Sequence, residues 1–87
     1  MNNLKKMYEF FVRISDDSDE QALPDQERIL MKTMQMLTLS GVMADFMMAS
    51  GDIQILGIII NAGGALNKSV IEKARVRMLE VINREMN

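Results

Sequence analysis

The stretch ILMKTMQMLTLSGVMADFMMASGDIQILGIIINAGGAL, residues 29–66, decides how this chain folds. It contains only three charged side chains, Lys32, Asp45 and Asp52. A segment with so few charges must be shielded from water, either inside the fold or against another chain. No catalytic or cofactor motif accompanies it, so the sequence says more about the fold than about the function.

An amphipathic helix precedes this stretch. Its apolar stripe has the i, i+3, i+4, i+7 spacing of one helix face and comprises Leu4, Met7, Tyr8, Phe11 and Ile14. Phe10 lies off that stripe, so we expect it to be exposed. The acidic residues 16–20 then favour a loop, because clustered like charges repel and short polar side chains compete for backbone hydrogen bonds.

The apolar stretch itself predicts three helical segments. The first begins at Pro24 and ends near Leu39; it is apolar on more than one face, which is typical of a central helix. Ser40 and Gly41 resemble a helix end, so a short second helix is expected over residues 42–49. Ser50 and Gly51 repeat this helix-end signal. Residues 53–61 are rich in isoleucine and could form a strand, but no second strand-like run exists to pair with them, so a helix capped by Asp52 is preferred.

A last helix is predicted over residues 69–85. Ser69 and Glu72 have the spacing of a capping box, with Asn67 as a competing cap. The apolar stripe of this helix contains Ile71, Ala74, Met78, Val81 and Ile82. The expected fold is therefore an all-α bundle of four to five helices in one domain, residues 1–87. A chain of 87 residues buries only roughly 60–65% of its unfolded surface, so we expect a homodimer whose interface lies within residues 29–66.

Composition argues against an enzyme. The chain has no histidine and no cysteine, which removes the usual general base, thiolate nucleophile and zinc ligands. We expect no metal and no cofactor. The acidic span 16–27 has the length of an EF-hand calcium loop, but Gln21 stands where that loop needs glycine, and Pro24 occupies its ninth position.

The absence of cysteine favours a cytoplasmic protein, because small secreted domains usually depend on disulfides. A membrane span is not expected from residues 42–66, although they are mostly apolar. Asp45 and Asp52 would each cost about 2.5–3.5 kcal/mol near the centre of a bilayer.

Nucleic-acid binding is the alternative function. The turn at residues 61–64 could belong to a helix-turn-helix whose second helix presents the basic residues Lys68, Lys73, Arg75 and Arg77. A net charge of −2 disfavours this function. Acidic residues also interleave with the basic ones, so ion pairs such as Glu72 with Arg75 and Glu80 with Arg84 are expected on a solvated face.

The preferred function is that of a small non-enzymatic regulator or adaptor that binds another protein, as a homodimer. The methionines of the apolar stretch could fill a core or form an adaptable binding groove. Phe10 and Phe46 are the expected exposed anchors. The predicted protein-binding or dimer-interface residues are Phe10, Met34, Met43, Phe46 and Met47.

Overall fold

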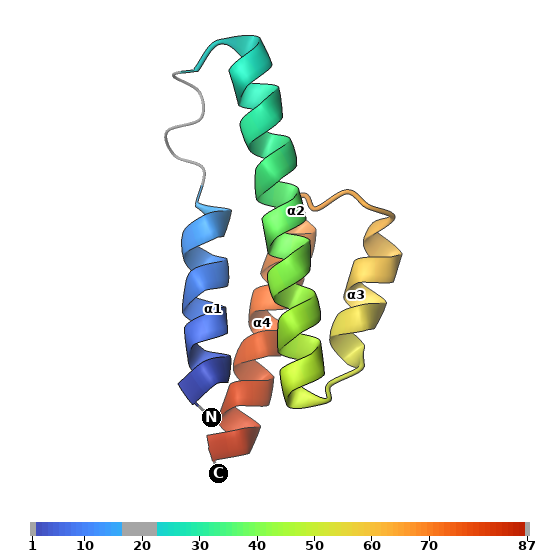
Figure 1. Cartoon of the computed structure of the whole chain (residues 1–87). Helices are drawn as coiled ribbons and strands as arrows, with labels where there is room; N and C mark the ends of the chain where they lie inside the picture. The colour runs from blue at the N-terminus through green and yellow to red at the C-terminus, as the bar shows by residue number, and fades with distance from the viewer. Residues whose placement is uncertain (1, 17–22, 87) are drawn as a thin grey trace.

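The computed structural model describes residues 2–16 and 23–86, and these form four α-helices without any strand. The helices are α1 (Asn2–Ser15), α2 (Asp25–Ser50), α3 (Gln54–Ala62) and α4 (Lys68–Met86). In Figure 1, α1 and α3 flank α2 on opposite sides and α4 lies behind it. α1 and α3 each pack against both α2 and α4. The all-α prediction is confirmed, and the segment predicted over residues 53–61 is the helix α3 rather than a strand.

α2 is one continuous helix, so the predicted break at Ser40 and Gly41 is wrong. A buried stripe runs through the predicted break: Leu39 lies on one side of it, and Val42, Met43 and Phe46 lie on the other. A glycine inside a helix costs about 1 kcal/mol relative to alanine. Burial of four apolar side chains at about 1.5–3 kcal/mol each outweighs that cost, because an unbroken helix keeps them in one line.

The second predicted helix end, at Gly51, is confirmed. Gly51 has φ = 75°, the left-handed conformation that glycine adopts without steric penalty. Its backbone N–H donates to the carbonyl oxygen of Met47 at 2.8 Å, which closes the last turn of α2.

The core lies where α1, α2 and α4 meet, and α3 closes one side of it. Its buried side chains are Leu4, Phe11, Leu39, Val42, Met43, Phe46, Ile55, Ala74, Met78, Val81 and Ile82. The members from α1 and α4 all belong to the apolar stripes predicted for these helices. A further link joins α1 to α2, since the Gln35 side-chain amide donates to the carbonyl oxygen of Ile14 at 2.7 Å.

The start of α4 differs from the predicted capping box. The helix begins at Lys68, and the Oδ1 atom of Asn67 accepts a hydrogen bond from the backbone N–H of Val70 at 3.0 Å. Asn67 is therefore the cap. Ser69 already lies inside the first turn, so it cannot act as the capping residue.

Candidate protein-binding surface

α2 presents apolar side chains on two opposite faces. The inner face contributes Leu39, Val42, Met43 and Phe46 to the core. The outer face carries a line of residues separated alternately by four and three positions, and we call this line the outer seam. It comprises Leu30, Met34, Leu37, Gly41, Ala44 and Met48. Its four large side chains are 57–78% exposed. This spacing is that of the a and d positions of a coiled coil, which normally face a second helix.

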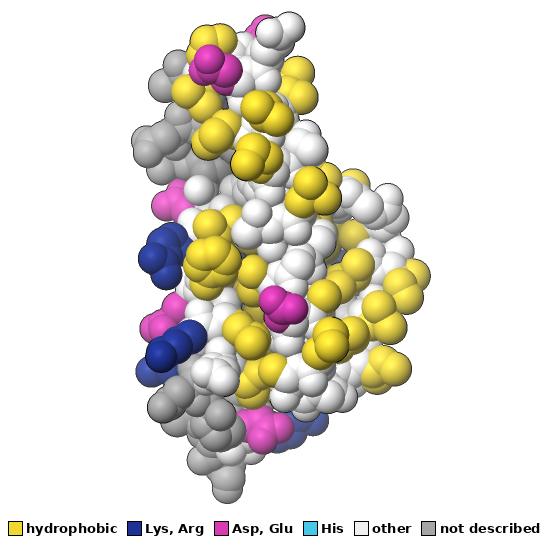
Figure 2. All heavy atoms as spheres, viewed as in Figure 1, with side chains coloured by type: hydrophobic (Ala, Val, Ile, Leu, Met, Phe, Trp, Pro, Cys, Tyr) yellow, Lys and Arg dark blue, Asp and Glu magenta, His cyan; other side chains and the backbone are white. Residues whose placement is uncertain are grey.

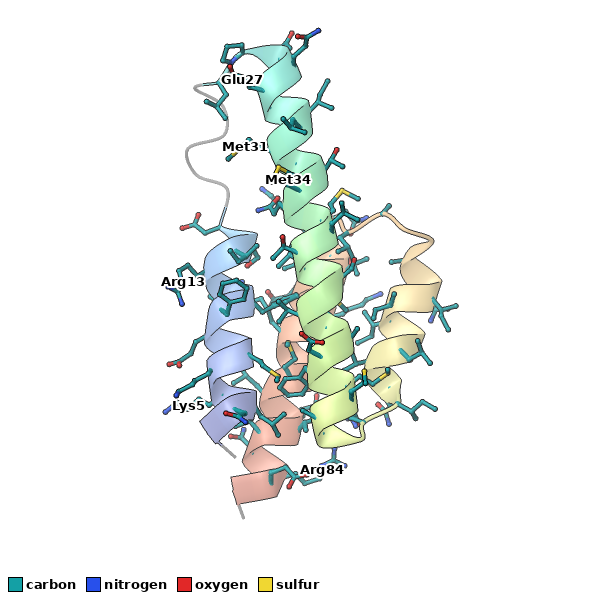
Figure 3. The ribbon with its side chains drawn as sticks, in the orientation of Figure 1. Lys5, Arg13, Glu27, Met31, Met34 and Arg84 are labelled. Carbon is teal, nitrogen blue, oxygen red and sulfur yellow. The ribbon has the colours of Figure 1, made fainter. Side chains whose placement is uncertain are left out.

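The N-terminal half of α2 projects beyond the other helices (Figure 1). Figure 3 shows Met31 and Met34 on this projecting part, with Glu27 at its far end. Ile29 and Met31 are also at least half exposed. Within the part of the chain that the structure describes, no helix is long and apolar enough to cross a membrane.

α3 widens the apolar surface beside the outer seam. Ile53, the N-cap residue of α3, and Ile60 are exposed, and Gly57 lies between them on the same face. Figure 2 shows hydrophobic side chains gathered over α2 and α3 on one side of the molecule, with few charged groups among them. Contiguous apolar surface of this kind is uncommon on monomeric proteins and marks interaction sites.

The predicted interface residues differ in how exposed they are. Phe10 and Met34 are exposed, and Met47 is half-buried beside the core. Phe10 lies on α1, where the guanidinium of Arg13 is 5.8 Å from the centre of its ring. Met43 and Phe46 are completely buried within the single chain, so Phe46 is not the exposed anchor that was predicted, and neither side chain lies on the surface described above. Both belong to the inner face of the continuous helix.

Sequence reasoning missed most of the outer seam. Leu30, Leu37 and Met48 were not singled out, although they and Met34 share the heptad spacing. The predicted helix end at Gly41 divided that spacing between two segments. Reading the helix through Gly41 would have aligned the residues on one face.

Arg77, one of the predicted nucleic-acid contacts, is held by acidic side chains. Its Nε atom donates to Oδ2 of Asp52 at 2.9 Å, its Nη2 atom to Oδ1 at 2.5 Å, and its Nη1 atom to Glu80 at 3.2 Å. The hydrogen bonds from Arg77 are the main cause of the lowered pKa of Asp52, and Arg84, 3.8 Å from Asp52, lowers that pKa further. The backbone N–H of Ile55 contributes as well, so Asp52 joins the start of α3 to α4.

The remaining basic residues of α4 are exposed or partly exposed. Arg75 pairs with Glu72 at 3.7 Å, as predicted, whereas Glu80 pairs with Arg77 instead of Arg84. Lys68 and Lys73 are exposed. Lys68 and Arg75 border a hollow of about 540 Å³ between α1, α2 and α4, whose lining also includes acidic and apolar side chains. The surface around α4 is therefore mixed in charge.

Half of the acidic span 16–27, which does not fit the EF-hand pattern, lies outside the described residues, because residues 17–22 are not described. Among residues 2–16 and 23–86, no three histidine, cysteine or acidic side chains are grouped so that they could hold a metal ion.

Comparison with known proteins gives no relative. No protein-family model matches the chain. No curated protein and no solved structure matches it significantly. The geometry of the surface therefore carries the functional argument.

Proposed function

We propose that this chain is a small non-enzymatic regulatory or adaptor protein that acts by binding protein, and that the outer seam of α2 is its binding surface. The observation that supports this proposal is the exposure of Leu30, Met34, Leu37 and Met48 on a helix whose opposite face is buried from Leu39 to Phe46. The heptad spacing of the outer seam suits a helix as the bound element, because knobs at a and d positions fit holes on a facing helix.

The exposed side chains are large enough to drive association. Fully burying a leucine or methionine contributes about 1.5–3 kcal/mol, and each of the four is more than half exposed, so their burial contributes on the order of 4–8 kcal/mol. Association costs an estimated 4–15 kcal/mol in lost freedom of motion. If both partners contribute comparable faces, the gain offsets this cost and binding is reversible.

Nucleic-acid binding by α4 has less support. Arg77 is committed to Asp52 and Glu80, and Arg75 to Glu72, which reduces the positive charge that could meet phosphates. A labelled DNA duplex provides the direct test. Binding at low salt that weakens steeply as salt is added would favour this alternative.

The proposed function is tested by capture with matched variants. A tagged wild-type chain, an outer-seam variant carrying Leu30→Glu and Leu37→Glu, and a control Asn83→Glu on α4 are each expressed in the source cell with untagged chain present. Asn83 is exposed and lies on a different helix from the outer seam. Captured proteins, including untagged copies, are quantified by mass spectrometry, and circular dichroism verifies that the variants are folded.

We expect one or more proteins to be captured by the wild type and by Asn83→Glu, and to be depleted at least tenfold with the outer-seam variant. A tenfold loss corresponds to about 1.4 kcal/mol, less than placing two carboxylates in an apolar contact should cost. Equal capture by the outer-seam variant, or no enrichment by the wild type, would contradict the proposal.

A further inference from the structure

We infer that the outer seam of α2 pairs in antiparallel orientation with the outer seam of a second copy of this chain. This inference rests on the proposed function and names the partner of the same surface. The pairing is two-fold symmetric, so the same face serves both copies.

The order of large and small residues along the outer seam fits its own reverse. When two copies are aligned antiparallel about residue 39, Leu30 lies opposite Met48 of the second copy, Met34 opposite Ala44, and Leu37 opposite Gly41. Each contact then joins an a position to a d position. Large side chains meet small ones in the middle, so the helices can approach closely and leave little empty space.

A parallel pairing in register is less favourable. It would place Gly41 against Gly41 and Ala44 against Ala44, which leaves unfilled space between the helices. It would also place the two Asp45 carboxylates at the same height along the paired helices. In the antiparallel arrangement Asp45 lies at the height of Thr33 of the second copy, and the two Asp45 residues are about 18 Å apart along the axis.

The shape of the molecule leaves room for this pairing. The projecting half of each α2 extends beyond the other three helices that the structure describes (Figure 1) and would lie across the C-terminal half of the other α2. There it reaches the side of α3, whose exposed Ile53 and Ile60 extend the apolar contact. The outer seam contains no charged residue, so it offers no recognition by charge to a strongly charged partner.

The contact is of modest size. The outer seam spans residues 30–48, which is about 28 Å of helix with a diameter of about 10–12 Å. Two such faces alone fall below the area of roughly 1,200–2,000 Å² that stable complexes bury, and the apolar side of α3 adds to it. We therefore expect a reversible dimer with a dissociation constant in the micromolar range.

Engineered cysteines test the orientation, because the natural sequence contains none. Met34→Cys and Ala44→Cys are prepared as two single variants. In the antiparallel dimer the two copies of either position are about 15 Å apart along the axis, whereas a disulfide needs Cα atoms about 4.4–6.8 Å apart. Under mild oxidation we expect neither single variant to cross-link, and an equimolar mixture to give a disulfide-linked dimer. Cross-linking by each single variant would show a parallel dimer and overturn the inference.

Sedimentation equilibrium separates the inference from the proposed function. The average mass of the wild type and of Asn83→Glu should rise from 9.9 kDa toward twice that value as concentration increases, while Leu37→Glu stays monomeric. A wild type that remains monomeric at every concentration overturns the inference. If it still captures another protein through the outer seam, the proposed function stands. A dimer that Leu37→Glu leaves intact overturns the inference as well.

Discussion

Leu37 and Leu39 are two residues apart on α2, yet the structure assigns opposite consequences to their truncation. Leu39 is 1% exposed in the core, and Leu37 is 69% exposed on the outer seam. Leu39→Ala removes a buried side chain and leaves a cavity, so we expect it to lower the free energy of unfolding by about 2–5 kcal/mol. Leu37→Ala loses little burial in a monomer and gains slightly in helix propensity, so its change should stay within about 0.5 kcal/mol.

Urea denaturation followed by circular dichroism measures both values. A domain of this size has a total stability of about 4–13 kcal/mol, so Leu39→Ala should shift the midpoint by about 1 M or more. The protein must be dilute enough to be monomeric, because in a dimer Leu37→Ala also removes an intermolecular contact. Equal losses for the two variants in the dilute sample would refute the assignment of inner and outer faces.

Three further predictions concern Asp52, the glycines of α2, and the start of α4. Arg77 lowers the pKa of Asp52 in the folded state. The contribution of this ion pair to the free energy of unfolding should therefore be fully present above the ordinary pKa of 3.8 and be lost as the pH falls below it. In urea titrations Asp52→Asn should lower the free energy of unfolding by about 1–3 kcal/mol near neutral pH and flatten its decline in acid. An unchanged pH profile would contradict the ion pair. Gly51→Ala should destabilise the protein by about 1–2 kcal/mol, because the backbone at residue 51 has a positive φ. At Gly41 an added Cβ would meet nothing within 4 Å, so Gly41→Ala should stabilise dilute protein by up to about 1 kcal/mol. The opposite order of thermal midpoints would contradict the continuous α2. Asn67→Ala should cost about 1 kcal/mol and Ser69→Ala less than about 0.5 kcal/mol, and the reverse ranking would restore the predicted capping box.

Local patterns in the sequence were sufficient for most of the fold. The stripes containing Phe11 and Met78 identified α1 and α4, because apolar residues at helical spacing need a core to face. The break predicted at Gly41 failed because a local stop signal was outweighed by packing on both sides of it. Gly51 follows a serine in the same way as Gly41, but no buried residue of α2 lies beyond it, so there the helix ends.

The candidate surface could be predicted only as a region. The low charge of residues 29–66 showed that apolar faces needed cover, but composition does not tell which residues face the core. Phe46 was assigned to a partner because aromatic residues are common anchors, yet its position on the inner face buries it in its own chain. Residues such as Leu37 become visible as candidates once α2 is one helix and its two faces can be compared.

Methionine methyl groups offer the most direct test of the central claim that α2 has one face in the core and another that receives a second chain. With ¹³C-labelled methionine methyls and a soluble paramagnetic probe, the signals of Met34 and Met48 should broaden in dilute protein, and those of Met43 and Met78 should not. Raising the concentration should protect Met34 and Met48 while Met43 and Met78 stay unchanged. Broadening of Met43 together with Met34 would contradict the account. Continued broadening of Met34 and Met48 at every concentration, and in the presence of all captured proteins, would contradict it as well.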